Sequence, residues 1–198
     1  MVADAAPGAQ VVVDAGAGTG YYLDQVQQQL PAAWPLALDI SKYALRRSAR
    51  TLPQGLSLVW DVWRPLPVAD AAADVVLNVF APRNPGEFRR ILADGGVLAV
   101  VTPGPGHLAE IRGLAGLLEI GGDKEQRVTQ ALASGFLLEQ ARHVDIPMTL
   151  GSAEVRSLAL MGPAAHHLDR TRLEAELHRL QGAVAVTAAF SLQLFRAV

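Results

Sequence analysis

Apolar positions between Val11 and Thr102 alternate between short continuous runs and a spacing of three or four residues. β-branched runs of this kind are typical of buried strands, and the wider spacing is typical of helices that pack one face on a core. The strands predicted from the runs are Val11–Ala15, Pro35–Asp39, Leu56–Trp60, Ala73–Phe80 and Val97–Thr102. The helices predicted between them are Tyr21–Leu30, Ser41–Arg50 with Ser41 as its cap, and Asn84–Leu92. Strands that alternate with helices predict a parallel sheet with right-handed crossovers.

The pattern after Thr102 is less regular. Helices are predicted at His107–Leu118, Ser152–Met161 and Thr171–Gln181. Two further apolar stretches, Arg142–Leu150 and Ala183–Phe195, are predicted to pair as an antiparallel hairpin. Residues 1–10 are interpreted as an entry segment and residues 11–198 as a single domain. The predicted fold is α/β and Rossmann-like, with a mostly parallel seven-stranded sheet that ends in a C-terminal antiparallel hairpin.

The composition narrows the class of protein. Hydrophobic residues make up 51% and charged residues 18% of the chain, as in globular domains. The net charge of −2 gives none of the overall basic character usual in nucleic-acid-binding domains. Without cysteine, the chain can form neither disulfides nor cysteine-based zinc sites, and we expect no metal. The absence of a signal segment and of a membrane-length apolar run favours a cytoplasmic protein without a membrane partner.

The stretch VVVDAGAGTGYY contains the first predicted strand and the glycine-rich turn that follows it. Glycine permits positive φ and lets a ligand approach the backbone, so this strand-to-helix turn predicts a nucleotide-type site. The dinucleotide fingerprint G-x-G-x-x-G would need glycine where Tyr21 stands. The spacing is G-x-G-x-G after an acid, which resembles motif I of S-adenosylmethionine (SAM) dependent methyltransferases of the Rossmann-like class I fold. The candidate cofactor-binding residues here are Asp14, Gly16, Gly18, Thr19 and Gly20.

Two acids at later strand ends extend this site. Asp39 lies 19 residues after Gly20 and is placed to accept hydrogen bonds from both ribose hydroxyls of an adenosine. An exposed strand-end acid near the Ser41 cap is the alternative. Asp61 follows the third strand, where an acid can meet the adenine amino group. Trp60 or Trp63 beside it could stack on the adenine or fill the core.

Two further candidates follow the later strands. Asn78, at the end of the fourth strand, begins a loop expected to face the methyl group and the acceptor, although a strand end closed by proline is the alternative. His107 follows two Pro-Gly pairs and is a candidate cofactor contact or a surface residue. The histidines and paired arginines elsewhere are interpreted as surface residues: His166, His167 and His178, and Arg46/Arg47 and Arg89/Arg90.

Taken together, these stretches resemble the catalytic domain of the large-subunit ribosomal RNA (guanine-N1)-methyltransferases, a family that includes macrolide-resistance members. The stretches are DAGAGTGYYL, ALDISKYALRRSAR, FAPRNPGEFRRIL, TPGPGHLAEIRGL and GFLLEQARHVDIPMTLGSAEVRSLALMGPAAHH. The resemblance implies SAM as cofactor, with contacts at Gly18, Thr19 and His107 and with Asp39 on the ribose. It implies large-subunit rRNA as partner and guanine N1 in a hairpin loop as acceptor, since loops offer unstacked bases.

The family also carries an N-terminal zinc ribbon with cysteine ligands. This chain begins about ten residues before its first strand and has no cysteine, so it resembles the methyltransferase domain alone. Two other functions stay open: a small-molecule methyltransferase of the same fold, which the net charge favours, and a SAM-binding domain without activity of its own. The sequence names no catalytic base and leaves the oligomeric state open, with a dimer among the alternatives.

Overall fold

The structure is a computed structural model that describes residues 1–112, 124–161, 169–180 and 182–198. Its described part forms two compact units. The first comprises Met1–Thr102, Gln126–Arg142 and Leu192–Val198, and the second comprises Pro103–Glu125 and His143–Ser191. The single domain expected over residues 11–198 stays a prediction.

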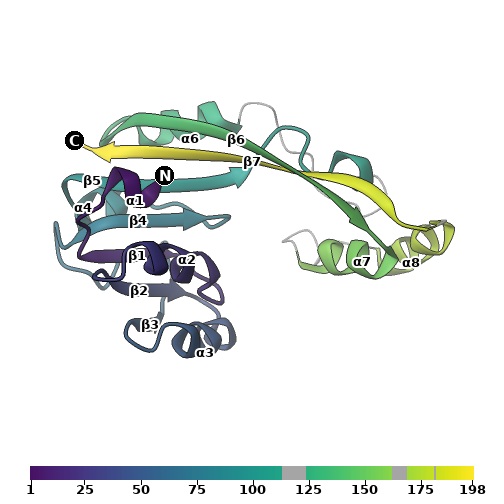
Figure 1. The fold of residues 1–198 in the computed structure, drawn as a ribbon, viewed down its shortest axis with the longest axis horizontal. Coiled ribbons are helices and arrows are strands. Elements are labelled where there is room, and N and C mark those ends of the chain that lie inside the picture. Colours follow the sequence, from purple (N-terminus) through teal and green to yellow (C-terminus); the bar gives the residue numbers. More distant parts are fainter. Residues whose placement is uncertain (113–123, 162–168, 181) are drawn as a thin grey trace. The chain divides into compact units, whose positions relative to one another are not determined.

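Seven strands form one mixed sheet in the order β3-β2-β1-β4-β5-β7-β6 (Figure 1). Their bounds are β1 Val11–Ala15, β2 Trp34–Asp39, β3 Leu56–Val59, β4 Ala73–Val79, β5 Leu92–Pro103, β6 Phe136–Leu150 and β7 Val184–Ala197. Strands β1 to β5 pair in parallel, with Val13 opposite both Leu36 and Val76. The arrow of β7 runs against those of β5 and β6 in Figure 1. The predicted parallel sheet with an antiparallel C-terminal hairpin is therefore confirmed.

The helices between β1 and β5 have bounds close to those predicted from the sequence. The helices are α1 Val2–Ala5, α2 Tyr21–Gln29, α3 Lys42–Thr51, α4 Pro85–Ile91, α6 Lys124–Leu132, α7 Ser152–Met161 and α8 Arg170–Arg179, with a 3₁₀ turn η1 at Ala109–Ile111. Ser41 caps α3 by accepting a hydrogen bond from the Ala44 amide at 3.3 Å, as its residue type predicts. Within the described ranges, none of these helices has the length and apolar character needed to cross a bilayer.

Some boundaries differ from the pattern. The strand expected over Val97–Thr102 is longer in the structure, because β5 already begins at Leu92 and includes Gly95 and Gly96. Pairing of Leu92 with Ala73 of β4 extends the strand across the glycines, because tertiary strand pairing outweighs a local turn preference. Helix α6 and the first residues of β6 were not predicted. Of the helix expected over His107–Leu118, the structure shows η1, and residues 113–118 lie outside the described ranges.

The first unit buries apolar side chains on both faces of the sheet. Val13 and Val76 pack with Phe88 of α4 on one face, and Val12 and Val75 pack with Leu23 of α2 on the other. Neighbouring residues of a strand point to opposite faces, so the continuous valine runs are what a doubly covered sheet requires. The second unit has its own apolar cluster, built from Leu108, Ile111, Val155, Ala159, Leu173, Leu177 and Val186.

Candidate functional site

The glycine-rich loop between β1 and α2 is fixed to the end of β2. The amides of Gly16 and Ala17 both donate to the Leu38 carbonyl, at 2.8 and 2.9 Å. Gly16, Gly18 and Gly20 have φ of 97°, 55° and 82°, all in the left-handed region that favours glycine. The predicted strand-to-helix turn is therefore present, and it lies where β1 and β2 end.

The three glycines are required for different reasons. A Cβ on Gly16 would lie 2.3 Å from the Cβ of Ala81, and one on Gly20 would lie 2.7 Å from the Ser48 hydroxyl. A Cβ on Gly18 would meet nothing within 4 Å. Gly16 and Gly20 therefore serve close packing within the protein, whereas Gly18 leaves open space in front of the backbone. That space lets a ligand approach the main chain.

Asp39 lies at the end of β2 and holds the glycine loop. Its Oδ2 accepts a hydrogen bond from the Gly18 amide at 2.9 Å, and its Oδ1 accepts one from the Ser41 amide at 2.8 Å. A carboxylate offers about four acceptor positions, so both oxygens retain capacity for further donors. Asp39 thus joins the loop, the end of β2 and the start of α3. Its predicted contact with a ribose stays a prediction.

We expect the substitution Asp39→Asn to loosen this junction. An amide can accept at one position only, so one of the two backbone amides loses its acceptor, at a cost of about 1–2 kcal/mol. Thermal unfolding of the purified variant measures the loss. The matched control is Asp61→Asn, because Asp61 accepts one backbone hydrogen bond, from the Trp63 amide at 3.0 Å. Equal losses in the two variants would contradict the role assigned to Asp39.

Asp14 is a buried carboxyl group next to this loop. It is 1% exposed, and neither of its oxygens has a hydrogen-bond partner within the described residues. Burial raises the pKa of Asp14 to about 7, and the nearby charge of Asp39 adds to the shift. A buried acid without a partner is costly, and one at a candidate site indicates a ligand that pairs with it. A carboxylate here would complement a cation.

Asn78 ties the end of β4 to the end of β1. Its side-chain amide donates to the carbonyls of Ala15 at 3.2 Å and Pro82 at 2.7 Å, and the residue is fully buried. Its Oδ1 has no partner within the described residues, and the same holds for Oγ1 of Thr102, near the end of β5. The carboxyl ends of β1, β4 and β5 therefore each carry a buried polar side chain with an unpartnered oxygen. Thr102 was not predicted as a site residue, and the contact of Asn78 with a cofactor stays a prediction.

An exposed aromatic group lies at the same edge of the first unit. The ring of Tyr22 is 6.1 Å from that of Phe80 and 5.2 Å from that of Tyr21, with edge-on geometry in both pairs. Tyr22 and Phe80 are 44% and 45% exposed. Phe80 has a φ of 53°, a strained value for a bulky residue and one often found at functional sites. The loop after Asn78 was expected to face the acceptor, but Tyr21, Tyr22 and Phe80 were not predicted as site residues.

The two tryptophans after β3 have different environments. Trp60 packs against the core, and its indole donates to the Pro65 carbonyl at 3.0 Å. Trp63 is 67% exposed and lies in the turn that Asp61 holds. Trp63 is therefore the tryptophan that remains available for stacking. The contact of Asp61 with an adenine amino group stays a prediction.

His107 belongs to the second unit. Its Nδ1 lies 2.8 Å from the Ala189 carbonyl, and its ring is 5.0 Å from that of Phe190. A carbonyl only accepts hydrogen bonds, so Nδ1 must carry the proton, which fixes the orientation of the ring. The role of His107 toward a cofactor stays a prediction. His178 is exposed on α8, and His166 and His167 lie outside the described residues.

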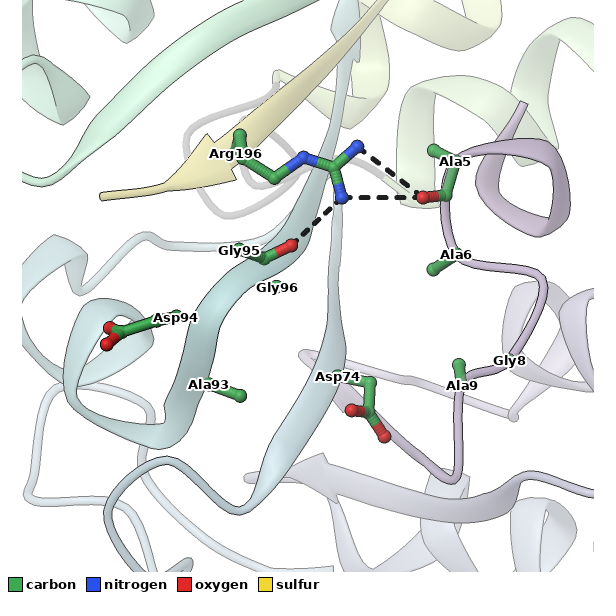
Figure 2. A pocket seen from close by; sticks show the side chains of 10 residues that line it. All are labelled: Ala5, Ala6, Gly8, Ala9, Asp74, Ala93, Asp94, Gly95, Gly96 and Arg196. Carbon is green, nitrogen blue, oxygen red and sulfur yellow. Dashed lines mark hydrogen bonds between the residues drawn. The ribbon is translucent and has the colours of Figure 1, made fainter.

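The opposite edge of the first unit holds a cavity of about 200 Å³ (Figure 2). The guanidinium of Arg196 donates across it to the carbonyls of Ala5 and Gly95, and Asp74 accepts from the amides of Gln10 and Val11. These polar groups are hydrogen-bonded within the protein, and their bonds fasten the N-terminal segment to the sheet. In the described ranges, no group of three or more His, Asp or Glu side chains is arranged to hold a metal ion.

Comparison with solved structures defines the class of fold. A SAM-dependent methyltransferase from Mesorhizobium loti matches 96% of this chain and 91% of its own, with a TM-score of 0.56 and 16% identity. The [4+2]-cyclase SpnF matches 98% of this chain and 78% of its own, with a TM-score of 0.61 and 16% identity. The protein therefore has the Rossmann-like fold of class I SAM-dependent methyltransferases. Because a cyclase shares that fold, the fold by itself does not define the reaction.

Within that class, sequence relatives confirm the resemblance to the large-subunit rRNA (guanine-N1)-methyltransferases. The 23S rRNA (guanine(748)-N(1))-methyltransferase of Streptomyces fradiae is 42% identical over 185 residues, 93% of this chain. A protein of Micromonospora griseorubida, assigned as a 23S rRNA (guanine-N(1)-)-methyltransferase, is 46% identical over 189 residues, 95% of this chain. The chain spans 66% and 64% of the lengths of these two relatives.

A more distant relative has a different acceptor. The malonyl-[acyl-carrier protein] O-methyltransferase of Methylococcus capsulatus is 37% identical over 110 residues, which is 51% of this chain and 40% of the relative. No family model matches the chain. Similarity over nearly the whole chain is thus found with the rRNA enzymes, and similarity over half of it with an enzyme acting on a carrier protein.

Proposed function

We propose that this protein is a SAM-dependent methyltransferase that methylates N1 of a guanine in a hairpin loop of large-subunit rRNA, in the cytoplasm. The observation that carries the proposal is the similarity to two rRNA guanine-N1 methyltransferases at 42% and 46% identity over more than nine-tenths of the chain. The acids and glycines of the first unit support it, because their arrangement suits the cofactor of those enzymes.

The residues of the first unit fit SAM. The ammonium group of its methionine moiety would meet the carboxyl of Asp14, which has no partner within the described residues. The open space in front of Gly18 would admit the cofactor, and the remaining acceptor positions of Asp39 would take the ribose hydroxyls. When bound, SAM supplies an electrophilic methyl group on its sulfonium.

The acceptor would lie against the aromatic group of Tyr21, Tyr22 and Phe80. Flipped or unpaired bases are commonly held by stacking on such side chains. Asn78 fixes the loop that carries Phe80 to the end of β1, and the ring of Phe80 lies 6.1 Å from that of Tyr22, which follows the glycine loop. Transfer requires the acceptor nitrogen about 3 Å from the methyl carbon and in line with it. Guanine N1 also loses a proton, and we assign no residue to that step.

Methylation of defined RNA tests the proposal. The full chain is incubated with labelled SAM and a transcript of the 23S rRNA hairpin that contains the guanine at position 748, the position named for the Streptomyces fradiae relative. The expected result is label recovered as 1-methylguanosine after nuclease digestion. The control transcript carries adenine at that position and should take up no label. Binding of SAM without transfer to either this hairpin or whole ribosomal RNA would overturn the proposed activity.

A small or carrier-bound acceptor is the second candidate, favoured by the 37% identity to the malonyl-[acyl-carrier protein] enzyme. In the same assay, malonyl-acyl-carrier protein replaces the RNA. Transfer to the carrier protein with none to RNA would establish this alternative. We expect the reverse, because this relative is similar over only half of the chain.

A further inference from the structure

Helix α3 carries an exposed cationic face. Its sequence, KYALRRSART, contains four basic residues and no acidic one, in a chain whose net charge is −2. Lys42, Arg46, Arg47 and Arg50 are all exposed, and none forms an ion pair within the described part of the chain. The opposite face, with Leu45 and Ser48, is buried against the fold. The helix is thus held rigidly with its charges directed to solvent.

The other arginine pair of the first unit has a different environment. Arg90 pairs with Glu87 and Asp70, both at 2.7 Å, and Arg89 pairs with Asp94 at 2.6 Å. In the sequence Arg46/Arg47 and Arg89/Arg90 look alike, and both were interpreted as solvated surface. The structure distinguishes the two pairs. Arg89 and Arg90 on α4 form ion pairs that stabilise the protein's own loops, whereas Arg46 and Arg47 on α3 form no ion pair within the described residues.

The arrangement of charge on α3 is unfavourable for the isolated helix. Lys42 and Arg46, and Arg46 and Arg50, stand four residues apart, where like charges destabilise a helix by about 0.2–0.5 kcal/mol per pair. Lys42 also lies in the first turn, where the helix dipole disfavours a cation. Charge repulsion that destabilises a helix, and that no ion pair within the described residues offsets, indicates that these side chains serve a function other than stabilising the fold. A polyanion bound to this face would relieve the repulsion.

Tyr43 adds an aromatic surface between the charges. It is 68% exposed, with the Lys42 Nζ 5.2 Å and the Arg46 Cζ 5.9 Å from its ring centre. Exposed rings flanked by cations are typical of surfaces that bind single-stranded RNA, where bases stack and phosphates pair with the charges. Ser41, the N-cap of the helix, donates its amide to Asp39, so this face starts beside the candidate cofactor site.

We propose that the exposed face of α3, formed by Lys42, Tyr43, Arg46, Arg47 and Arg50, binds the phosphate backbone of the RNA that carries the target base, with Tyr43 stacking on an unpaired base. The inference rests on the proposed function, since it names the surface that holds the RNA. It also explains how a chain with net charge −2 can bind a polyanion: positive charge is concentrated on one helix.

A charge-neutralised helix tests this surface. The variant Arg46→Gln, Arg47→Gln, Arg50→Gln retains good helix formers and removes three charges. We expect its affinity for the fluorescent rRNA hairpin to fall about tenfold or more, and the slope of log affinity against log salt to become less steep by about 2. The control Arg170→Gln, Arg172→Gln, Arg179→Gln removes three charges from α8 and should bind like wild type. SAM affinity should stay unchanged in both, which separates RNA docking from damage to the fold.

A second pair of variants probes the stacking. Tyr43→Ala should weaken hairpin binding about fivefold or more, and Tyr43→Phe should bind like wild type. Equal weakening by the α3 and α8 triple variants, or none by the α3 variant, overturns the inference while the proposed function stands. The inference is also overturned if the α3 triple variant loses binding to anionic lipid vesicles but retains its binding to the RNA hairpin. If the wild-type chain neither binds nor methylates the hairpin, the proposed function itself fails.

Discussion

Asp14→Asn is expected to weaken SAM binding about a hundredfold or more, while making the ligand-free protein more stable above pH 7. Removing one partner of a buried charge pair typically costs about 3 kcal/mol or more, which corresponds to that loss of affinity. Asp14 is buried and has no partner within the described residues, so its charge destabilises the fold and is favourable only toward a bound cation.

The direction of the stability change follows from the pKa. The pKa of Asp14 is about 7 in the folded protein against 3.8 for an ordinary aspartate, so the folded state holds its proton more tightly. Between pH 4 and 7 the unfolded state therefore binds fewer protons, and stability falls as pH rises through this range. The penalty reaches about 4 kcal/mol above pH 7 and vanishes below pH 4. The Asp14→Asn variant would be free of this penalty, because an amide does not ionise.

Calorimetry and denaturant unfolding at several pH values measure both effects. Unfolding free energies of wild type and Asp14→Asn should agree near pH 4 and diverge by pH 8, in favour of the variant. Wild-type SAM affinity should rise between pH 5.5 and 7.5, with a proton released from Asp14 on binding at pH 6, and the variant should show neither. A variant less stable than wild type at pH 8, or one with unchanged SAM affinity, would show that Asp14 has a structural partner instead.

Gly18→Val is expected to abolish measurable SAM binding and leave the sheet folded. A Cβ at this position meets no protein atom within 4 Å, so the side chain would occupy the space assigned to the cofactor. The residue also has a φ of 55°, where a side chain costs about 1–2 kcal/mol. The variant should therefore unfold at a somewhat lower temperature without losing its cooperative transition.

Gly95→Val is the matched control. Gly95 also has positive φ, 75°, and open space at its Cβ position, but it lies at the opposite edge of the first unit beside Arg196. Its backbone strain should be similar and its effect on SAM affinity negligible. Gly18→Ala, with a smaller side chain, serves as a second test if the valine variant proves too strained. Titration calorimetry decides the matter: unchanged affinity in the Gly18 variants would make the loop purely structural.

Local chemistry made much of this protein predictable from its sequence. The valine run Val11–Val13 and the glycines after it define β1 and its turn, because backbone preference and strand burial act on neighbouring residues. Ser41 was identified as the cap of α3 for the same reason, since a cap interacts with an amide three residues away. These predictions depended on interactions within a few residues, and the structure confirmed them.

Contacts between distant residues were decided by the tertiary structure. The sequence marked Asp39 and Asn78 as site residues, but the bond from Gly18 to Asp39 spans 21 positions and that from Asn78 to Ala15 spans 63. The aromatic pair of Tyr22 and Phe80 forms for the same reason, through the pairing of β1 with β4. A linear pattern carries residue type and local spacing, and it does not specify which partner the fold brings within hydrogen-bond distance.

The glycine loop and the basic helix after β2 show most clearly which features the sequence determines and which the tertiary structure decides. The sequence by itself determined the strand-helix order, the G-x-G-x-G turn and the acid at the end of β2, because these follow from backbone chemistry and periodicity. Only the tertiary structure decided that Asp14 is buried without a partner within the described residues, that Gly18 faces open space, and that the arginines of α3 lack the ion pairs found on α4. Burial and pairing depend on the whole packed unit, since each is set by atoms that distant parts of the chain supply.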